Sequence, residues 1–173
     1  LIVLSYSCAT IPKLSKEDKK IINAVVKAPL PETINGETGF AQSGNHKIWY
    51  EKINVESDPK GTVLLIMGNG QDALAWPPDF ISNLSEAGYE VIRYDHRGTG
   101  LSESEEKWKK KDPYDLTDMA NDAIAVLDAT KTKSGHIVGV SMGGMIAQII
   151  AIENPEKTSS LTSIMSSGDG LDP

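Results

Sequence analysis

The hexapeptide GVSMGG at residues 139–144 constrains this chain more than any other feature, because apolar runs flank it on both sides. The run before it, HIVGV at residues 136–140, is short and β-branched, as in a buried strand. The run after it, MIAQIIAI at residues 145–152, is long and apolar enough for a buried helix. The sequence therefore predicts a strand, a tight glycine-rich turn and a helix in direct succession.

Within this turn, Gly139, Ser141 and Gly143 fill the pattern G-x-S-x-G. Such a turn holds its serine in a strained backbone conformation at the tip, and the small residues let the strand and the helix approach each other. The helix N-terminus then directs free N–H groups at the reacting centre. We predict that Ser141 is a catalytic nucleophile. The alternative interpretation is a glycine-rich turn in which the serine is incidental.

Strand and helix patterns alternate four times from Thr62 onward, which is typical of a parallel sheet with helices on both faces. Apolar residues recur at three- and four-residue spacing from Leu116, as in an amphipathic helix on a sheet. Parallel strands end at one edge of a sheet, so the loops that follow them should open onto one rim. The predicted strands are residues 62–67, 90–94, 136–140 and 161–165, and a further helix is predicted at residues 78–87.

The N-terminal region differs in character from the rest of the chain. Residues 15–27 predict a short amphipathic helix with Ser15 as N-cap. Residues 28–44 are rich in Pro, Gly, Thr and Asn, which favours a linker or loop. Residues 46–55 alternate well enough for an early antiparallel strand. We therefore predict a leader remnant, short helix and linker over residues 1–44, followed by the main domain over residues 45–173.

An activated serine also needs hydrogen-bond donors for the oxyanion that forms during attack. The backbone N–H of Met142, directly after the predicted nucleophile, is one candidate. The second should come from the loop after the first parallel strand, where Gly68, Asn69 and Gly70 follow one another. We predict that the backbone amide of Asn69 is this donor. The alternative is that the loop is a plain tight turn.

The proton-accepting base is harder to find, because the sequence contains only three histidines. His136 opens the strand before the turn, which places it at the far end of the sheet. His46 belongs to the early strand, away from the rim. His96 is on the rim, within the glycine-rich turn DHRGTGLS, which is typical of a structural turn. Asp95 and Arg97 in the same turn are predicted to form a charge pair that braces the loop.

Two carboxylates, Asp169 and Asp172, follow the last predicted strand and could orient a histidine. No histidine follows them in the sequence. The chain therefore provides a nucleophile and an oxyanion hole without a convincing base. We predict no metal and no cofactor.

The net charge of −7 and the sequence pI near 5.0 argue against binding to nucleic acid or, by charge alone, to an anionic membrane. The one basic cluster, KWKKK at residues 107–111, follows an acidic run. This alternation is typical of a solvated loop.

Cys8 is the only cysteine, so an internal disulfide is excluded. It follows an apolar run too short to span a bilayer. The run and Cys8 are similar to the end of a bacterial lipoprotein signal, which makes Cys8 a candidate lipidation site and predicts an exported, membrane-anchored protein. A truncated ordinary signal peptide with an incidental cysteine is the alternative, and so is a cytoplasmic location. The chain begins at Leu1 rather than Met and stops after GDGLDP, so we expect both ends to be cut.

Three motifs together resemble the α/β-hydrolase superfamily: GVSMGG after one strand, DHRGTGLS after an earlier strand, and a loop beginning with Met67 and Gly68. Residues 63–173 are similar to one branch in particular, the aclacinomycin methylesterase-like carboxylic ester hydrolases. The resemblance implies a nucleophile at Ser141 and oxyanion amides at Met142 and Asn69. In that family the acid and the histidine follow a cap inserted near where this chain stops, so the resemblance implies an N-terminal part of the fold without the cap and last strands.

The leading hypothesis is a fragment of a serine hydrolase that cleaves a small-molecule carboxylic ester through an acyl-enzyme. A catalytically inactive, ligand-binding protein of the same fold is the alternative, and an acyltransferase or a peroxidase-type relative is a third. Epoxide and haloalkane hydrolases are disfavoured, because those relatives need a carboxylate where Ser141 stands. The identity of the ester and the oligomeric state are left open.

Overall fold

The computed structural model describes residues 15–27, 35–56, 58–104 and 113–168. The chain divides into two units, Leu1–Glu32 and Thr33–Pro173. In the first unit the described residues form α1 (Lys16–Lys27). Its N-terminus confirms the predicted cap: the Ser15 hydroxyl accepts from the Asp18 amide at 3.0 Å, and the Asp18 carboxylate accepts from the Ser15 amide at 2.9 Å.

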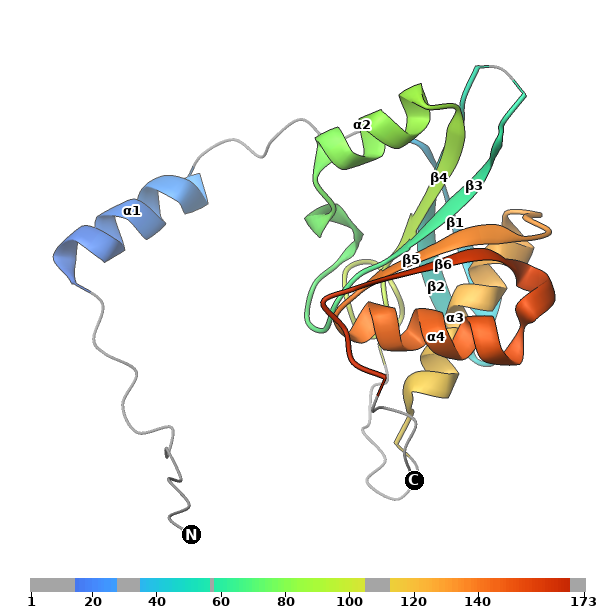
Figure 1. The fold of residues 1–173 in the computed structure, drawn as a ribbon. Coiled ribbons are helices and arrows are strands. Elements are labelled where there is room, and N and C mark those ends of the chain that lie inside the picture. The colour runs from blue at the N-terminus through green and yellow to red at the C-terminus, as the bar shows by residue number, and fades with distance from the viewer. Residues whose placement is uncertain (1–14, 28–34, 57, 105–112, 169–173) are drawn as a thin grey trace, which may run out of the picture. The chain divides into compact units, whose positions relative to one another are not determined.

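The second unit is built on a six-stranded sheet in the order β1-β2-β4-β3-β5-β6 (Figure 1). The first two strands are antiparallel to their neighbours, and the other four run parallel to one another, as predicted. The strands are β1 (Glu37–Ser43), β2 (His46–Ile53), β3 (Gly61–Ile66), β4 (Tyr89–Tyr94), β5 (Gly135–Val140) and β6 (Thr158–Ile164).

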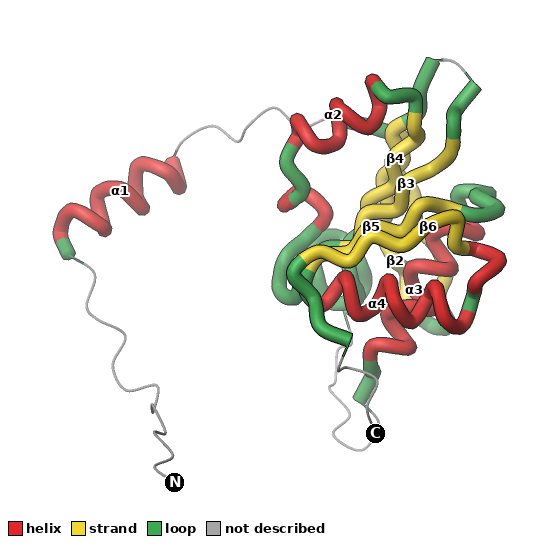
Figure 2. Tube along the Cα trace, in the orientation of Figure 1, coloured by secondary structure: helices red, strands yellow, loops and turns green. Residues whose placement is uncertain are grey.

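Helices cover both faces of this sheet (Figure 2). Alternate residues of β3 point to opposite faces: Leu64 and Ile66 pack in the cluster with two of the helices, whereas Val63 and Leu65 pack in the other cluster with α2. The helices are α2 (Pro78–Glu86), α3 (Leu116–Ala129) and α4 (Met142–Glu153), of which α3 and α4 share a face, and short 3-10 turns lie at Ala73–Ala75 and Pro155–Lys157.

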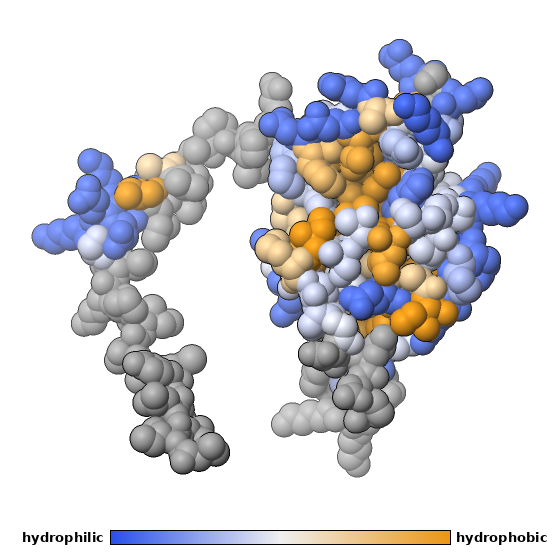
Figure 3. All heavy atoms as spheres, viewed as in Figure 1, coloured by the Kyte–Doolittle hydropathy of each residue, from blue (hydrophilic) through white to orange (hydrophobic). Residues whose placement is uncertain are grey.

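The face that α2 covers is only partly closed. Within the described part of this unit, α2 is the α-helix on that face, and Val138 and Val140 of β5 are half-buried there. Figure 3 shows apolar atoms at the surface between α2 and the strands β5 and β6.

The predicted loop over residues 28–44 is wrong from Glu37 onward, because β1 occupies Glu37–Ser43 and pairs with β2 along its whole length. The turn between the two strands contains Gly44, whose φ of +53° favours glycine. Ala41 is fully buried, but most of the other residues of β1 are exposed. A strand with so few apolar residues carries little periodicity, so composition alone predicted a loop.

The last strand is more polar at its edge than expected. β6 pairs with β5, and among the described residues no strand pairs with its other side. The sequence predicts that this edge is apolar, but the exposed positions of β6 carry hydroxyl side chains apart from Leu161, which is 41% exposed. Serine and threonine solvate an open edge, so the expectation of an apolar edge is wrong.

A buried ion pair joins the antiparallel and parallel parts of the sheet. Arg93 of β4 and Glu51 of β2 are cross-strand neighbours that are 2% and 4% exposed. The Arg93 guanidinium donates from Nε at 2.7 Å and contacts the same carboxylate from Nη2 at 2.6 Å. The second carboxylate oxygen accepts from the Gly36 amide at 2.7 Å. Removing one partner of such a pair leaves a charge buried without its counter-ion.

We expect Glu51→Gln to lower the free energy of unfolding by about 3 kcal/mol, because the Arg93 guanidinium would lose its carboxylate in a desolvated site. Denaturant titration of the purified chain measures this difference. The matched control is Asp128→Asn, whose partner Lys157 lies in a more exposed pair, with an expected loss below about 1 kcal/mol. Equal losses in the two variants would contradict the prediction.

Candidate active site

Ser141 lies between β5 and α4 with φ 55° and ψ −122°. A left-handed φ of this kind is uncommon for a residue with a side chain and marks a strained turn. The Ser141 amide donates to the Ile164 carbonyl of β6 at 2.9 Å, and its side chain is exposed. The predicted geometry of the turn, a serine in an unusual conformation between a parallel strand and a helix, is therefore confirmed.

The two glycines of the pattern allow the strand and the helix to touch. A Cβ atom at Gly139 would overlap the backbone carbonyl of Gly143. A Cβ atom at Gly143 would in turn overlap the Ile66 carbonyl at the end of β3. Neither position has room for a side chain without movement of the backbone, so both glycines set the packing of α4 against the sheet.

The loop after β3 lies against the candidate nucleophile. A Cβ atom placed on Gly68 would be 3.3 Å from Ser141 Cβ and 3.9 Å from Ser141 Oγ. The next two residues of this loop, Asn69 and Gly70, are exposed. The backbone amides of Asn69 and Met142 donate to no acceptor within the described residues. Their role as oxyanion donors stays a prediction, which these free amides support.

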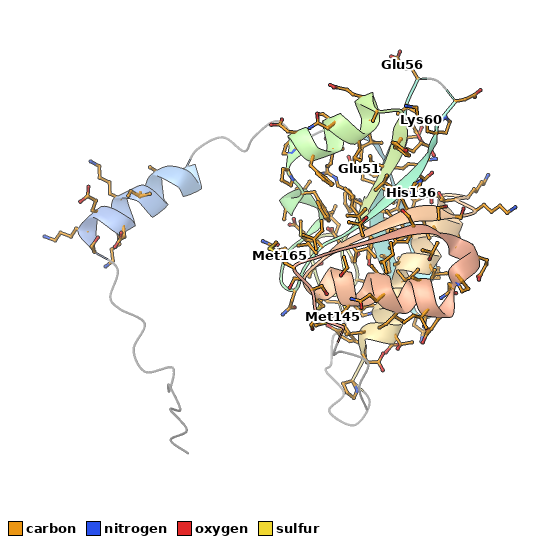
Figure 4. The ribbon with its side chains drawn as sticks, in the orientation of Figure 1. Glu51, Glu56, Lys60, His136, Met145 and Met165 are labelled. Carbon is orange, nitrogen blue, oxygen red and sulfur yellow. The ribbon has the colours of Figure 1, made fainter. Side chains whose placement is uncertain are left out.

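His136 lies at the opposite end of the sheet from the loops that follow the parallel strands, as predicted. Its Nδ1 is 2.8 Å from the Ser160 hydroxyl, and its ring meets Tyr89 edge-on. In Figure 4 the labelled His136 and Met165 stand at opposite ends of β5 and β6. His136 is therefore no candidate for the base.

His46 is closer to the rim than predicted. Because β2 runs antiparallel to β4, its first residue lies at the end of the sheet where the parallel strands finish. The expectation that His46 lies away from the rim is wrong in this respect. However, β4 and β3 stand between β2 and β5, and three strand spacings are about 14 Å. His46 is thus separated from Ser141 across the sheet.

His96 is 2% exposed, and its Nε2 is 2.8 Å from the Met67 carbonyl oxygen. A carbonyl only accepts, so Nε2 carries the proton and Nδ1 is the unprotonated nitrogen. Burial lowers the pKa of His96 from its ordinary value, against the opposing effects of the Met67 carbonyl and of the Asp122 and Asp95 carboxylates. This environment fits the structural turn predicted here rather than a proton acceptor for Ser141.

The predicted charge pair of Asp95 with Arg97 is wrong, because each residue has other partners. Arg97 donates from Nε and Nη2 to the two carboxylate oxygens of Asp122, at 2.7 Å in both cases. Asp95 instead accepts from the backbone amides of Ala73 and Leu101.

The partner of Arg97 comes from α3, where Asp122 is 1% exposed. Asp122 stands three residues after Met119 and four before Val126, on the buried face of the helix. The position of Asp122 among the apolar residues of this helix was the sequence signal that its carboxylate would be buried and would need a cation as partner.

Several predicted features fall outside the described residues: Cys8, the cluster at residues 107–111, and the carboxylates Asp169 and Asp172. Within the described ranges no group of three His, Cys, Asp or Glu side chains is placed to hold a metal ion. None of the helices described here combines the length and the apolar character that crossing a membrane requires.

Residues 61–173 match the family described as alpha/beta hydrolase fold. The chain is 40% identical over 125 residues to the rhodomycin D methylesterase DauP of Streptomyces sp. (strain C5). It is 38% identical over 125 residues to the rhodomycin D methylesterase DnrP of Streptomyces peucetius. Both matches cover 72% of this chain and 40% of the relative, so the chain spans about 40% of the length of these curated relatives.

The fold is also found in solved structures. An esterase from Exiguobacterium antarcticum superposes with a TM-score of 0.62 at 26% identity, and the match covers 77% of this chain and 46% of that one.

We expect Gly139→Ala to lower the free energy of unfolding by about 3 kcal/mol, because the added methyl group meets the Gly143 backbone rather than a movable side chain. Gly44→Ala is the control: its φ is left-handed, unlike that of Gly139, but no atom lies within 4 Å of the added Cβ, so about 1 kcal/mol is expected from backbone strain alone. Thermal or urea unfolding of both variants measures the difference. A loss at Gly139 no larger than at Gly44 would show that the close approach is not needed.

We also expect His96 to make folding stability depend on pH. Burial places its folded pKa below the ordinary value of 6.5. Between these two pKa values the unfolded chain binds a proton that the folded chain does not. Stability from this source is therefore present at neutral pH and declines as pH falls. Unfolding measured at pH 7.5 and 5.5 should show a larger loss for the wild type than for His96→Gln, which has no ionisable group there. Equal losses would mean that His96 is not buried in its neutral form.

Proposed function

Because the chain belongs to the α/β-hydrolase family, we propose that it is part of a serine hydrolase that cleaves a small carboxylic ester through an acyl-enzyme. The observation that carries this proposal is the strained Ser141 at the tip between β5 and α4, with the loop after β3 packed against it. An exposed serine beside backbone amides that donate to no acceptor within the described residues fits the arrangement that acyl transfer requires.

In the proposed reaction, Ser141 Oγ attacks the ester carbonyl carbon while a base takes its proton. The carbonyl oxygen becomes an oxyanion, which the amides of Met142 and Asn69 stabilise at the N-terminus of α4 and in the loop after β3. Collapse of this intermediate breaks the ester C–O bond, and the alcohol leaves with a proton from the protonated base. Water then attacks the acyl-enzyme, which releases the carboxylic acid and restores Ser141.

The base and its orienting acid come, in this proposal, from residues other than these 173. His136 lies at the far end of the sheet, His46 lies on a strand three spacings from β5, and His96 is buried with its Nε2 bonded to the Met67 carbonyl. The chain corresponds to about 40% of the length of its methylesterase relatives, which leaves room for both groups in a longer protein.

For the substrate we propose a methyl ester of a small organic molecule. Two relatives at 38–40% identity are named rhodomycin D methylesterases. Methanol is a small leaving group, so the protein must recognise mainly the acyl part of such an ester.

We expect the full-length protein to hydrolyse p-nitrophenyl acetate and simple methyl esters, and Ser141→Ala to reduce kcat by about 10³-fold or more. A fluorophosphonate should lose fluoride and add the mass of its phosphonyl group to Ser141 in the wild type, and to no residue in the variant. The 173-residue chain alone should not exceed its own Ser141→Ala variant, because it lacks the base.

Other results would change the assignment. Turnover that survives Ser141→Ala would remove Ser141 as the nucleophile. Tight binding of an ester without turnover in the full-length protein would favour the inactive, ligand-binding alternative. Ser141-dependent turnover by the 173-residue chain would show that one of its own histidines serves as the base.

A further inference from the structure

The loop that carries Asn69 is held at both ends by two consecutive residues, Asp95 and His96, that directly follow β4. Before the loop, His96 Nε2 donates to the Met67 carbonyl at 2.8 Å. After the loop, the Asp95 carboxylate accepts from the Ala73 amide at 2.8 Å. The segment between these two contacts, residues 68–72, begins at Gly68, where an added Cβ would lie 3.3 Å from Ser141 Cβ.

This segment has little packing of its own. Asn69, Gly70 and Gln71 are exposed, and Gly70 has a φ of +74° with no atom within 4 Å of an added Cβ. Glycine loses more conformational freedom on folding than any other residue, so a loop of this composition is not ordered by its own sequence. Its conformation therefore depends on contacts at its ends: the two above, and the bonds by which Asp72 caps the 3-10 turn, from the Leu74 amide to its side chain and from the Ala75 amide to its carbonyl.

The contact at the first end is specific to one form of the histidine. The His96 ring is buried and lies edge-on to Tyr94, with ring centroids 5.3 Å apart. Its Nδ1 has no hydrogen-bond partner within the described residues. The ring thus makes one hydrogen bond, to the Met67 carbonyl, although a buried unpaired nitrogen costs free energy. That a histidine stands here despite this cost indicates that its one hydrogen bond, from Nε2 to the Met67 carbonyl, has a role.

The carbonyl that His96 holds also borders α4. A Cβ atom at Gly143 would lie 2.6 Å from the Met67 oxygen, so the first turn of α4 passes directly beside it. The peptide between Met67 and Gly68 is therefore fixed between His96 and the helix that begins after Ser141. The next peptide along the chain supplies the Asn69 amide.

The contact at the second end, between the Asp95 carboxylate and the Ala73 amide, is fixed by the neighbours of Asp95. Asp95 is 3% exposed, and its second carboxylate oxygen accepts from the Leu101 amide at 2.8 Å. A Cβ atom at Gly100 would overlap this carboxylate. The Ser102 hydroxyl donates to the Asp95 carbonyl at 2.7 Å. The turn after β4 therefore fixes Asp95, and Asp95 fixes Ala73.

We propose that His96 and Asp95 are positioning residues for the oxyanion hole: together they hold residues 68–72 so that the Asn69 amide faces the carbonyl that Ser141 attacks. The inference rests on the function proposed above. Neither side chain touches the substrate. A displacement of about 1 Å in a catalytic group can lower a rate by about 10²-fold, so loss of either contact should act on the transition state.

The test compares two replacements of His96 in the full-length protein. Glutamine can place its Nε2 donor near the position of the imidazole Nε2, whereas asparagine is too short to reach the Met67 carbonyl. We expect His96→Asn to lower kcat by about 10²-fold with KM within about 3-fold. Phenylboronic acid, which forms a tetrahedral adduct with an active serine, should bind more weakly by a similar factor. His96→Gln should recover most of both losses, and His136→Asn, at the far end of the sheet, should change neither.

A second measurement needs no activity. Nitrogen-15 NMR of the full-length protein should show His96 protonated at Nε2 and unprotonated at Nδ1. Hydrogen exchange of the backbone at residues 68–72 should be faster in His96→Asn than in His96→Gln, with α3 and α4 unchanged. Asp95→Asn, which replaces one acceptor oxygen with a donor, should likewise speed exchange at Ala73. An Nδ1-protonated ring, or equal exchange in the two His96 variants, would overturn the inference.

The two proposals fail in different ways. If the wild type turns over esters through Ser141 but His96→Asn keeps its kcat, the positioning role is wrong and the proposed function stands. The same conclusion follows if kcat falls while boronate affinity does not. If the full-length wild type has no Ser141-dependent turnover, the proposed function is wrong, and the catalytic role of the two residues is wrong with it.

Discussion

The close approach between the start of α4 and the end of β3 is the constraint on which the rest of this site depends. It exists because Gly143 has no side chain to meet the Ile66 and Met67 carbonyls. The same approach places Ser141 at the tip of a left-handed turn and brings the loop after β3 against it. One packing contact without side chains thus brings together the candidate nucleophile, the helix N-terminus and the loop that carries Asn69.

Two buried ion pairs join elements that are distant in the sequence. Arg93 and Glu51 join β4 to β2, and Arg97 and Asp122 join the turn after β4 to α3. Pairs of this kind are weak sources of stability, but they fix geometry because breaking either one leaves a buried charge. The segment after β4 is thus tied to α3 by Arg97 and to the loop after β3 by Asp95 and His96. Ser141 is exposed.

Much of this arrangement follows from the sequence, because apolar periodicity and glycine spacing are local signals. The pattern around Ser141 and the spacing from Leu116 predicted β5, α4 and α3 with correct order and direction. β1 was missed, since its residues are mostly polar and it is stabilised by pairing with β2 rather than by its own apolar content. The partner of Arg97 was also missed, because a contact between the turn after β4 and α3 depends on tertiary packing that a linear pattern does not contain.

In the proposed site, Ser141, Met142 and Asn69 converge on one reacting carbonyl. A crystal structure of the full-length protein with a phosphonate bound to Ser141 tests this most directly. We expect one phosphonyl oxygen to lie about 2.7–3.1 Å from the backbone nitrogens of both Met142 and Asn69. An Asn69 amide that points away from the adduct, or an adduct on any residue other than Ser141, would contradict it.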